Sequence, residues 1–217
     1  MRDRLTKLNL SESVIEAYLA LYFKYKTDPS KIGNCDSIKS PSSSSLVLYD
    51  SLPNPNDLQK VFGKLAVCKL NGGLGTSMGC SGAKAMIVVK EGETFLDLII
   101  DQISKINNGN GVSIPLIFMN SFYTHGETQK IISDHPSGVD IHCFQQNQFP
   151  RLRKRDDQPL SEADFGREAW YPPGHGDIYH CLLHNGILDK LLEEGREVIF
   201  VSNADNLGSV VDARILS

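Results

Sequence analysis

The chain has 217 residues and a net charge of −4 with histidine counted as neutral, and 41% of its residues are hydrophobic. This size and composition are ordinary for a globular protein that buries a real core. The sequence contains no Lys- or Arg-rich block, no apolar run of membrane-spanning length and no signal-peptide-like start. We therefore expect a cytoplasmic protein that binds neither nucleic acid nor membranes.

The cysteines give no sign of a disulfide framework or a structural zinc site. They are odd in number, widely spaced and never arranged as C-x-x-C. We interpret them as reduced thiols, with Cys68 as a small core residue in an apolar strand. The five positions are Cys35, Cys68, Cys80, Cys143 and Cys181.

Residues 11–26 have the pattern of an amphipathic helix. Ser13 and Glu16 have capping-box spacing. The apolar stripe of this helix consists of Val14, Ile15, Tyr18, Leu19, Tyr22 and Phe23.

A long polar stretch separates this helix from the rest of the chain. Residues 27–57 are rich in Ser, Pro, Asn and Asp, which is typical of a loop or mobile linker. We therefore predict an amino-terminal helix and flexible linker over residues 1–57 and a separate main domain over residues 58–217.

From residue 64 onward, apolar strand-like segments alternate with helical ones. This order, with apolar rather than alternating strands, favours an α/β fold with a mostly parallel, Rossmann-like sheet covered by helices on both faces. Ligands bind such sheets beyond the carboxyl ends of the strands. Strands are predicted at residues 64–70, 85–89, 114–119, 139–144 and 197–201.

Three helices are predicted between these strands, and one of them has a recognisable amino-terminal cap. Thr94 and Asp97 can cap a helix through about residue 106, which would bury Leu96, Ile99, Ile100 and Ile103. Further helices are predicted at residues 124–133 and 177–194, and an irregular stretch at residues 147–174.

A glycine-rich loop follows the first predicted strand. Its sequence from Leu70 to Gly79 is LNGGLGTSMG, and Lys84 comes shortly after. Glycines let backbone N–H groups approach anionic oxygens, and a lysine adds a point charge for phosphate. The spacing fits neither the dinucleotide fingerprint nor the P-loop. A phosphate-binding loop is the favoured interpretation, and a tight turn between two strands is the alternative.

Three other residues are candidates for binding a ligand or a metal ion. The amide of Gln146 offers one acceptor and two donors that can match the edge of a nucleobase as a pair, although a solvated loop glutamine is the simpler interpretation. His175 lies between glycines before a predicted helix and could donate to a phosphate, although a structural histidine is the alternative. Asp205 follows a predicted strand and suits Mg²⁺, although an ordinary Asp/Asn turn is the alternative.

His180 and His184 have the i, i+4 spacing of a zinc protease motif. In the H-E-x-x-H motif of such proteases a glutamate follows the first histidine, and here that position is Cys181. We therefore do not predict a zinc site there.

Five segments, in order, resemble those of the UDP-glucose pyrophosphorylase family, and the match covers most of residues 64–212. One departure is Ala83, where many family members have proline before the lysine. The five segments are Lys69 to Lys84 (KLNGGLGTSMGCSGAK), Phe118 to Phe122 (FMNSF), Phe144 to Arg151 (FQQNQFPR), Trp170 to Asp177 (WYPPGHGD) and Phe200 to Leu207 (FVSNADNL).

The resemblance implies a nucleotidyltransferase that converts UTP and glucose 1-phosphate to UDP-glucose and pyrophosphate, with Mg²⁺ as cofactor. It also implies a longer chain that continues beyond Ser217, with a second phosphate-contacting lysine, and a possible oligomer. Lys84 would be catalytic and Asp205 would bind the metal. The implied nucleotide contacts are Leu70, Asn71, Gly72, Gly73, Lys84, Gln146 and Gly174. The implied sugar-phosphate contacts are Gly72, Gly73, His175, Asn203, Ala204 and Asp205.

Three other functions stay open at this point. The chain could be a pyrophosphorylase for N-acetylhexosamine phosphates or for several sugars. It could be a nucleotide-binding module without turnover, or a noncatalytic scaffold that binds no uridine nucleotide.

Overall fold

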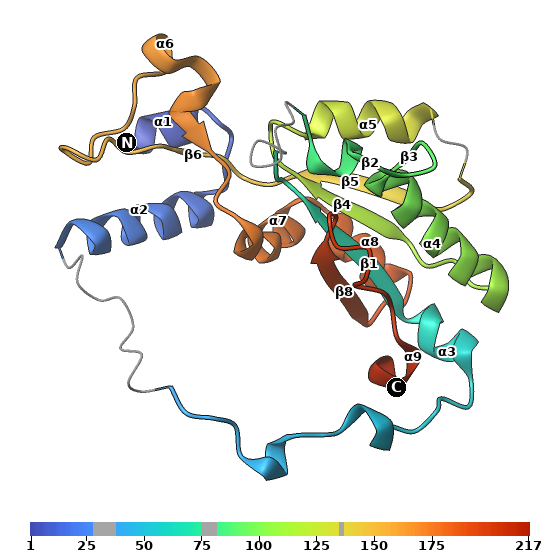
Figure 1. The fold of residues 1–217 in the computed structure, drawn as a ribbon. Helices are drawn as coiled ribbons and strands as arrows, with labels where there is room; N and C mark the ends of the chain where they lie inside the picture. Colours follow the sequence, from blue (N-terminus) through green and yellow to red (C-terminus); the bar gives the residue numbers. More distant parts are fainter. Residues whose placement is uncertain (28–37, 75–81, 135–136) are drawn as a thin grey trace. The chain divides into compact units, whose positions relative to one another are not determined.

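The chain folds into two units, each with its own apolar core. One unit contains Met1–Leu52 and Phe149–Tyr171, and the other contains Pro53–Gln148 and Pro172–Ser217. A domain boundary between residues 57 and 58 stays a prediction. The structure, a computed structural model, describes residues 1–27, 38–74, 82–134 and 137–217 (Figure 1).

The first unit is built around helix α2 (Glu12–Thr27) and a short antiparallel ribbon of β6 and β7. The ring of Tyr18 on α2 stacks on Phe149 of β6, with 4.5 Å between the ring centroids. The other elements of this unit are α1 (Arg2–Thr6), η2 (Ser43–Ser45), η3 (Tyr49–Ser51), β6 (Phe149–Pro150), α6 (Glu162–Phe165), η6 (Gly166–Ala169) and β7 (Trp170–Tyr171).

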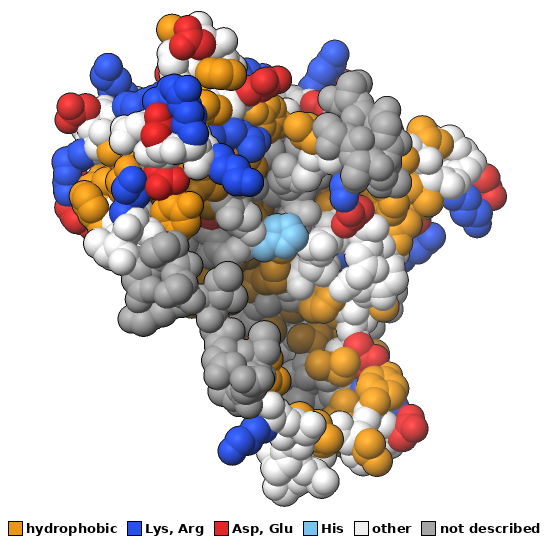
Figure 2. All heavy atoms as spheres, turned by 60° about the vertical axis from the view of Figure 1, so that its left-hand side comes forward, with side chains coloured by type: hydrophobic (Ala, Val, Ile, Leu, Met, Phe, Trp, Pro, Cys, Tyr) orange, Lys and Arg blue, Asp and Glu red, His pale blue; other side chains and the backbone are white. Residues whose placement is uncertain are grey.

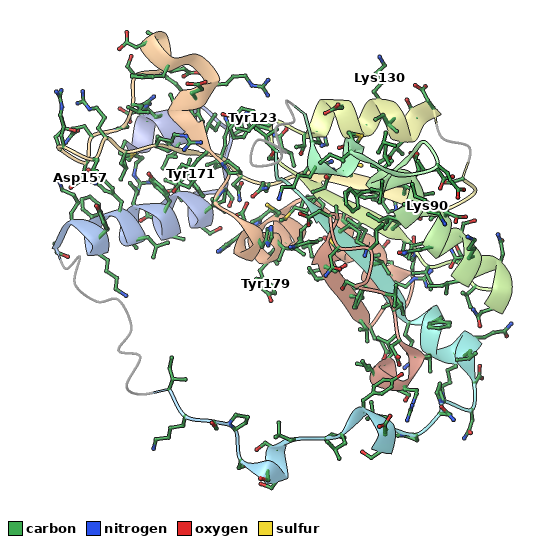
Figure 3. The ribbon with its side chains drawn as sticks, in the orientation of Figure 1. Lys90, Tyr123, Lys130, Asp157, Tyr171 and Tyr179 are labelled. Carbon is green, nitrogen blue, oxygen red and sulfur yellow. The ribbon has the colours of Figure 1, made fainter. Side chains whose placement is uncertain are left out.

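The structure confirms the helix predicted at residues 11–26 but corrects two details. Ser11 rather than Ser13 precedes the helix, and its Oγ accepts a hydrogen bond from the N–H of Val14 (3.4 Å). Phe23, placed in the apolar stripe by its spacing, is 60% exposed, so the buried face ends before it. At the far end of α2, Lys26 pairs with the carboxylate of Asp157, which is labelled in Figure 3.

The second unit contains a four-stranded sheet in the order β5-β4-β1-β8, and all of its neighbouring strands are parallel. Four of the five predicted strands are therefore confirmed, each within a few residues. Pro115 precedes β4, which keeps the missing N–H of proline outside the strand. The strands are β1 (Leu65–Asn71), β4 (Leu116–Asn120), β5 (Ile141–Gln145) and β8 (Val198–Asn203).

Helices cover both faces of this sheet, as the apolar strands indicate. Alternate residues of β1 point to opposite faces, so Val67 belongs to a core with α4 and Cys68 to a core with α7 and α8. The helices of this unit are α3 (Leu58–Gly63), α4 (Phe95–Asn110), α5 (His125–Asp134), α7 (Ile178–His184), α8 (Ile187–Glu193) and α9 (Ala213–Leu216), with short η5 (Lys84–Met86) and η7 (His175–Asp177).

Helix α4 agrees most closely with its prediction. Thr94 and Asp97 form a complete capping box, in which each side chain accepts a hydrogen bond from the backbone N–H of the other. Its buried residues are the four predicted, Leu96, Ile99, Ile100 and Ile103.

Two predictions for this unit are wrong. Residues 85–89 do not form a buried strand: they begin in η5 and continue into β2 (Val88–Lys90), which pairs only with β3 (Glu93–Thr94) in an exposed hairpin. The helix predicted at residues 177–194 is two helices. It breaks at Asn185, whose side-chain oxygen accepts a hydrogen bond from the N–H of Ile187 (2.9 Å) and starts a second helix.

Among the described cysteines, Cys68, Cys143 and Cys181 are free thiols, as predicted, while Cys35 and Cys80 lie outside the described residues. Burial raises the pKa of Cys68 to about 12. Within the described part of the chain, no helix has both the length and the apolar character needed to cross a membrane. Basic, acidic and apolar side chains are interspersed on the face shown in Figure 2.

The core and the hairpin should respond very differently to truncation. Replacing Ile99, which is fully buried against the sheet, with alanine should lower the free energy of unfolding by about 2–5 kcal/mol, because it removes packed methyl groups and leaves a cavity. The control is Val88→Ala in the exposed hairpin, which should change it by less than about 0.5 kcal/mol. Urea unfolding followed by far-ultraviolet circular dichroism measures both, and equal losses would contradict the assignment of these two segments.

Candidate functional site

A cavity of about 90 Å³ lies where β1 and β8 end. From β1 the sheet extends to β4 on one side and to β8 on the other, so the strand order reverses at this place, which is where open α/β sheets bind ligands. The residues that line the cavity are Leu70, Asn71, Gly73, Lys84, His175, Asn203, Ala204 and Asp205.

The charged groups in this cavity are paired with each other. The Nζ of Lys84 lies 3.2 Å from a carboxylate oxygen of Asp205, and each side chain is about one third exposed (30% and 34%). The backbone N–H of Lys84 donates to the carbonyl of Gly73 (3.1 Å). The backbone therefore holds Lys84 directly opposite the glycine-rich loop, with its amine free to leave Asp205 for another anion at little cost.

Gln146 lies immediately after β5, in a buried position between two other segments. A methyl group built on Gly72 would lie 2.2 Å from its Nε2, so any side chain at position 72 would have to displace the amide of Gln146. On the other side its Oε1 accepts a hydrogen bond from the N–H of Gly174 (3.3 Å). Gly174 has φ +107°, a conformation that L side chains rarely adopt. Gln146, only 3% exposed, thus connects the glycine-rich loop to the turn that carries His175.

A buried polar network supports the end of β1. The Nδ2 of Asn71 donates to the Oδ1 of Asn120 at the end of β4 (2.8 Å) and to the Oγ1 of Thr128 on α5 (2.9 Å). The carbonyl of Asn71 accepts from the Oγ1 of Thr124 (2.7 Å). Because all of these groups are buried, the network fixes the direction in which the chain leaves β1.

Glu127 on α5 anchors the far side of the glycine-rich loop, whose residues 75–81 lie outside the described residues. Its Oε2 accepts a hydrogen bond from the N–H of Ala83 (3.2 Å). A methyl group on Gly82 would lie 3.2 and 3.3 Å from its two carboxylate oxygens. Ala83 in turn bridges to Leu74, so the loop enters and leaves through paired backbone.

Asp177 is buried and holds the segment that contains Gln146. Its carboxylate accepts hydrogen bonds from the N–H of Asn147 (2.7 Å), from the Nδ2 of Asn147 (2.9 Å) and from the thiol of Cys181 (3.2 Å). Burial raises the pKa of Cys181 to about 12, with the charge of Asp177 adding to the effect, so this group stays a thiol donor.

The structure brings the predicted site residues together. Eight line one cavity, and the other three adjoin them: Gly72 precedes Gly73, Gly174 precedes His175, and Gln146 contacts both of these glycines. Which ligand atoms each residue contacts stays a prediction. Among the residues the structure describes, no group of three or more His, Cys, Asp or Glu side chains is arranged to hold a metal ion.

The residues that support the site from behind, including Thr124, Thr128, Glu127 and Asp177, carry no functional prediction from the sequence. Thr124 and Thr128 have i, i+4 spacing, with Thr124 just before α5 and Thr128 on it, and a pair of threonines with that spacing is compatible with many roles. Asp177 was visible in the segment GHGD, but its partner Asn147 is 30 residues away, and only the fold brings them together.

Comparison with known proteins gives one consistent family. The family described as UTP–glucose-1-phosphate uridylyltransferase matches residues 15–217. A UTP–glucose-1-phosphate uridylyltransferase from Musa acuminata is 45% identical over 224 aligned positions, which cover 100% of this chain and 48% of that protein. The enzyme of the same name from Saccharomyces cerevisiae is 42% identical, with 95% of this chain and 42% of that protein covered.

Solved structures agree with this result. The UDP-glucose phosphorylase from Trypanosoma brucei has a TM-score of 0.87 and 33% identity, with 99% of this chain and 46% of that one covered. A UDP-glucose pyrophosphorylase variant from Leishmania major, solved in complex with UDP-glucose, has a TM-score of 0.86 and 31% identity, with 99% and 45% covered. The chain thus spans about half the length of the relatives it matches.

The anchoring role of Glu127 gives a prediction for the loop. Replacing Glu127 with alanine removes the acceptor for the Ala83 N–H and should speed amide exchange at residues 83 and 84 on the order of threefold to tenfold, because one partly buried hydrogen bond is lost. Hydrogen–deuterium exchange measures this. Glu127→Gln keeps an oxygen acceptor and is the matched control. Unchanged exchange in the alanine variant would mean that Glu127 does not hold the loop.

Proposed function

Since this chain belongs to the UTP–glucose-1-phosphate uridylyltransferase family, we propose that it is the nucleotide-binding half of an enzyme that converts UTP and glucose 1-phosphate to UDP-glucose and pyrophosphate. This chain spans about half of its relatives' length, so the activity, substrates and partners of the whole enzyme are proposed for it and not carried over as established.

The single observation that carries the proposal is the cavity beyond β1 and β8. It presents the ammonium of Lys84, the carboxylate of Asp205 and the backbone of Gly73 within one small space. A cationic amine beside glycine backbone suits a phosphate group. The cavity itself, at about 90 Å³, is smaller than a typical ligand pocket, so it suits the phosphates and leaves the base and sugar for neighbouring surfaces.

For the nucleotide, we propose that the uracil lies against Gly72 and is read by Gln146. Gln146 is buried and held from two sides, which pre-organises its amide for a base with matched donors and acceptors. The remaining proposed nucleotide contacts are Leu70, Asn71, Gly73, Lys84 and Gly174.

For the sugar phosphate, we propose that the exposed side chain of His175 donates a hydrogen bond to the phosphate. His175 lines the same cavity as Lys84 and Asp205, so a phosphate could contact all three elements at once. The remaining proposed sugar-phosphate contacts are Gly72, Gly73, Asn203, Ala204 and Asp205.

The proposed reaction is a direct displacement. A phosphate oxygen of glucose 1-phosphate attacks the α-phosphorus of UTP in line, the bond from that phosphorus to the bridging oxygen breaks, and pyrophosphate leaves. The protein forms no covalent bond, so its task is to orient the two substrates and offset their charge. Lys84 stabilises charge on the UTP phosphates in this scheme.

Enzymes of this family commonly use a divalent metal, and we propose Mg²⁺ held by Asp205. Mg²⁺ is usually bound through one or two carboxylates together with substrate phosphates and water, which fits a cavity with one carboxylate. When bound, the cation would neutralise phosphate charge. An oligomer and a cytoplasmic location stay predictions of the sequence.

The function is tested directly by binding and turnover with this chain. Isothermal titration calorimetry with UTP and with UDP-glucose, beside an assay of pyrophosphate release, separates three outcomes. Turnover supports the full activity, and binding without turnover supports a nucleotide-binding half that needs the remaining polypeptide. Absence of binding to both uridine nucleotides would contradict the proposal and favour a noncatalytic scaffold.

Lys84 should contribute strongly to the affinity for UTP. Replacing it with methionine should weaken UTP binding by about tenfold to a hundredfold, because a charged hydrogen bond to phosphate is worth about 1.5–3 kcal/mol. Where turnover is measurable, kcat should fall about a hundredfold or more. Lys130→Met is the control, since Lys130 lies on α5 and is exposed (Figure 3). Equal affinity in the two variants would remove Lys84 from the site.

A further inference from the structure

Asp177 is a buried carboxylate without a role in the function proposed above. Two of its hydrogen bonds go to one residue, Asn147, through both the backbone N–H and the side-chain Nδ2. Its own N–H donates to the carbonyl of Gly174 (3.2 Å). Asp177 therefore connects the segment after β5 with the turn before α7, and both of these segments contact Gln146.

The contacts of Gln146 form a closed ring with those of Asp177. The N–H of Gly174 donates to the Oε1 of Gln146, Asp177 holds Gly174, and Asp177 also holds Asn147, the residue next to Gln146. The N–H of Gln146 donates to the carbonyl of Asn120 at the end of β4 (2.8 Å), so the backbone of Gln146 is fixed to the sheet. The ring additionally holds the side-chain amide of Gln146 in one orientation.

The orientation of the amide decides which base it can read. Uracil presents an N3–H donor and an O4 acceptor, whereas cytosine presents an N3 acceptor and an N4 donor. An amide turned one way matches uracil, and the same amide turned over matches cytosine. The N–H of Gly174 can pair with Oε1 but not with Nε2, so it selects one of the two orientations.

We infer that Asp177 is a positioning residue that sets base selectivity, because it holds Gly174 and Asn147 where they fix the amide of Gln146 in one orientation. This inference rests on the proposed function, since it assumes that Gln146 reads the base. The expected ligand is a uridine nucleotide, with cytidine nucleotides rejected by the fixed amide.

The change Asp177→Asn tests the inference, because it replaces only one carboxylate oxygen by an NH₂ group. In the native protein both carboxylate oxygens accept from Asn147, and an amide at position 177 would turn its NH₂ group toward one of those donors in either orientation. The ring should therefore open. In the double variant D177N/N147D the amide and carboxylate are exchanged, so the N–H at position 147 meets an oxygen and the new NH₂ group meets a carboxylate.

The experiment measures the affinities of this chain for UTP and CTP by calorimetry. The wild-type chain should prefer UTP, D177N should lower the ratio of UTP to CTP affinity by about tenfold, and D177N/N147D should restore most of it. Asp189→Asn, the same charge change at an exposed position on α8, should leave the ratio unchanged. A residue that only stabilises the fold would lower both affinities together and leave their ratio intact.

The outcomes separate the two proposals. A wild-type chain that binds no UTP would overturn the proposed function and this inference with it. A folded D177N chain that binds UTP with an undiminished preference over CTP would overturn this inference alone. If D177N does not fold, Asn147→Ala, which removes only the side-chain half of the contact, is measured instead, and an unchanged ratio there has the same meaning.

Discussion

The central position of β1 in the parallel sheet determines where the candidate site lies. β1 pairs with β4 on one side and β8 on the other, and its residues Leu65–Cys68 are fully buried between two helix layers. A strand in this position cannot shift or tilt without breaking both ladders. Its carboxyl end is therefore a fixed point, and the polar network around Asn71 fixes the first residue beyond it.

From that fixed point, the site is assembled by close contacts between backbone and side chains of separate segments. Gly72 leaves room for Gln146, and the backbone of Gly73 pairs with that of Lys84. At the end of β8, the N–H of Ala204 donates to the carbonyl of Leu70 (3.0 Å), which holds Asp205 beside the loop. These contacts are short and each joins two segments that are separate in the sequence, so the site depends on how the sheet places those segments.

The sequence predicted those parts that depend on local pattern and on motif. The helix at Thr94 was predicted with its cap and its buried face, because capping and apolar spacing are both local. Val88 and Val89 misled the strand prediction, since β-branched residues favour extended structure without deciding whether it is buried. Asp177 could not have been assigned its partner, because the contact joins residues 30 positions apart and forms only when β5 and α7 are placed by the sheet.

The ion pair between Lys84 and Asp205 explains how the cavity can hold opposite charges and still accept an anion. With both side chains about one third exposed, solvent screens the pair and its contribution to stability is about 0–1 kcal/mol. A phosphate entering the cavity would attract the ammonium and repel the carboxylate, so the carboxylate would then favour a cation beside the phosphate. Without a ligand, the charges of Lys84 and Asp205 thus neutralise each other. In the proposed complex, Lys84 contacts a phosphate and Asp205 contacts a cation. A weak pair suits this role better than a buried one, because separating its members costs little of the binding free energy.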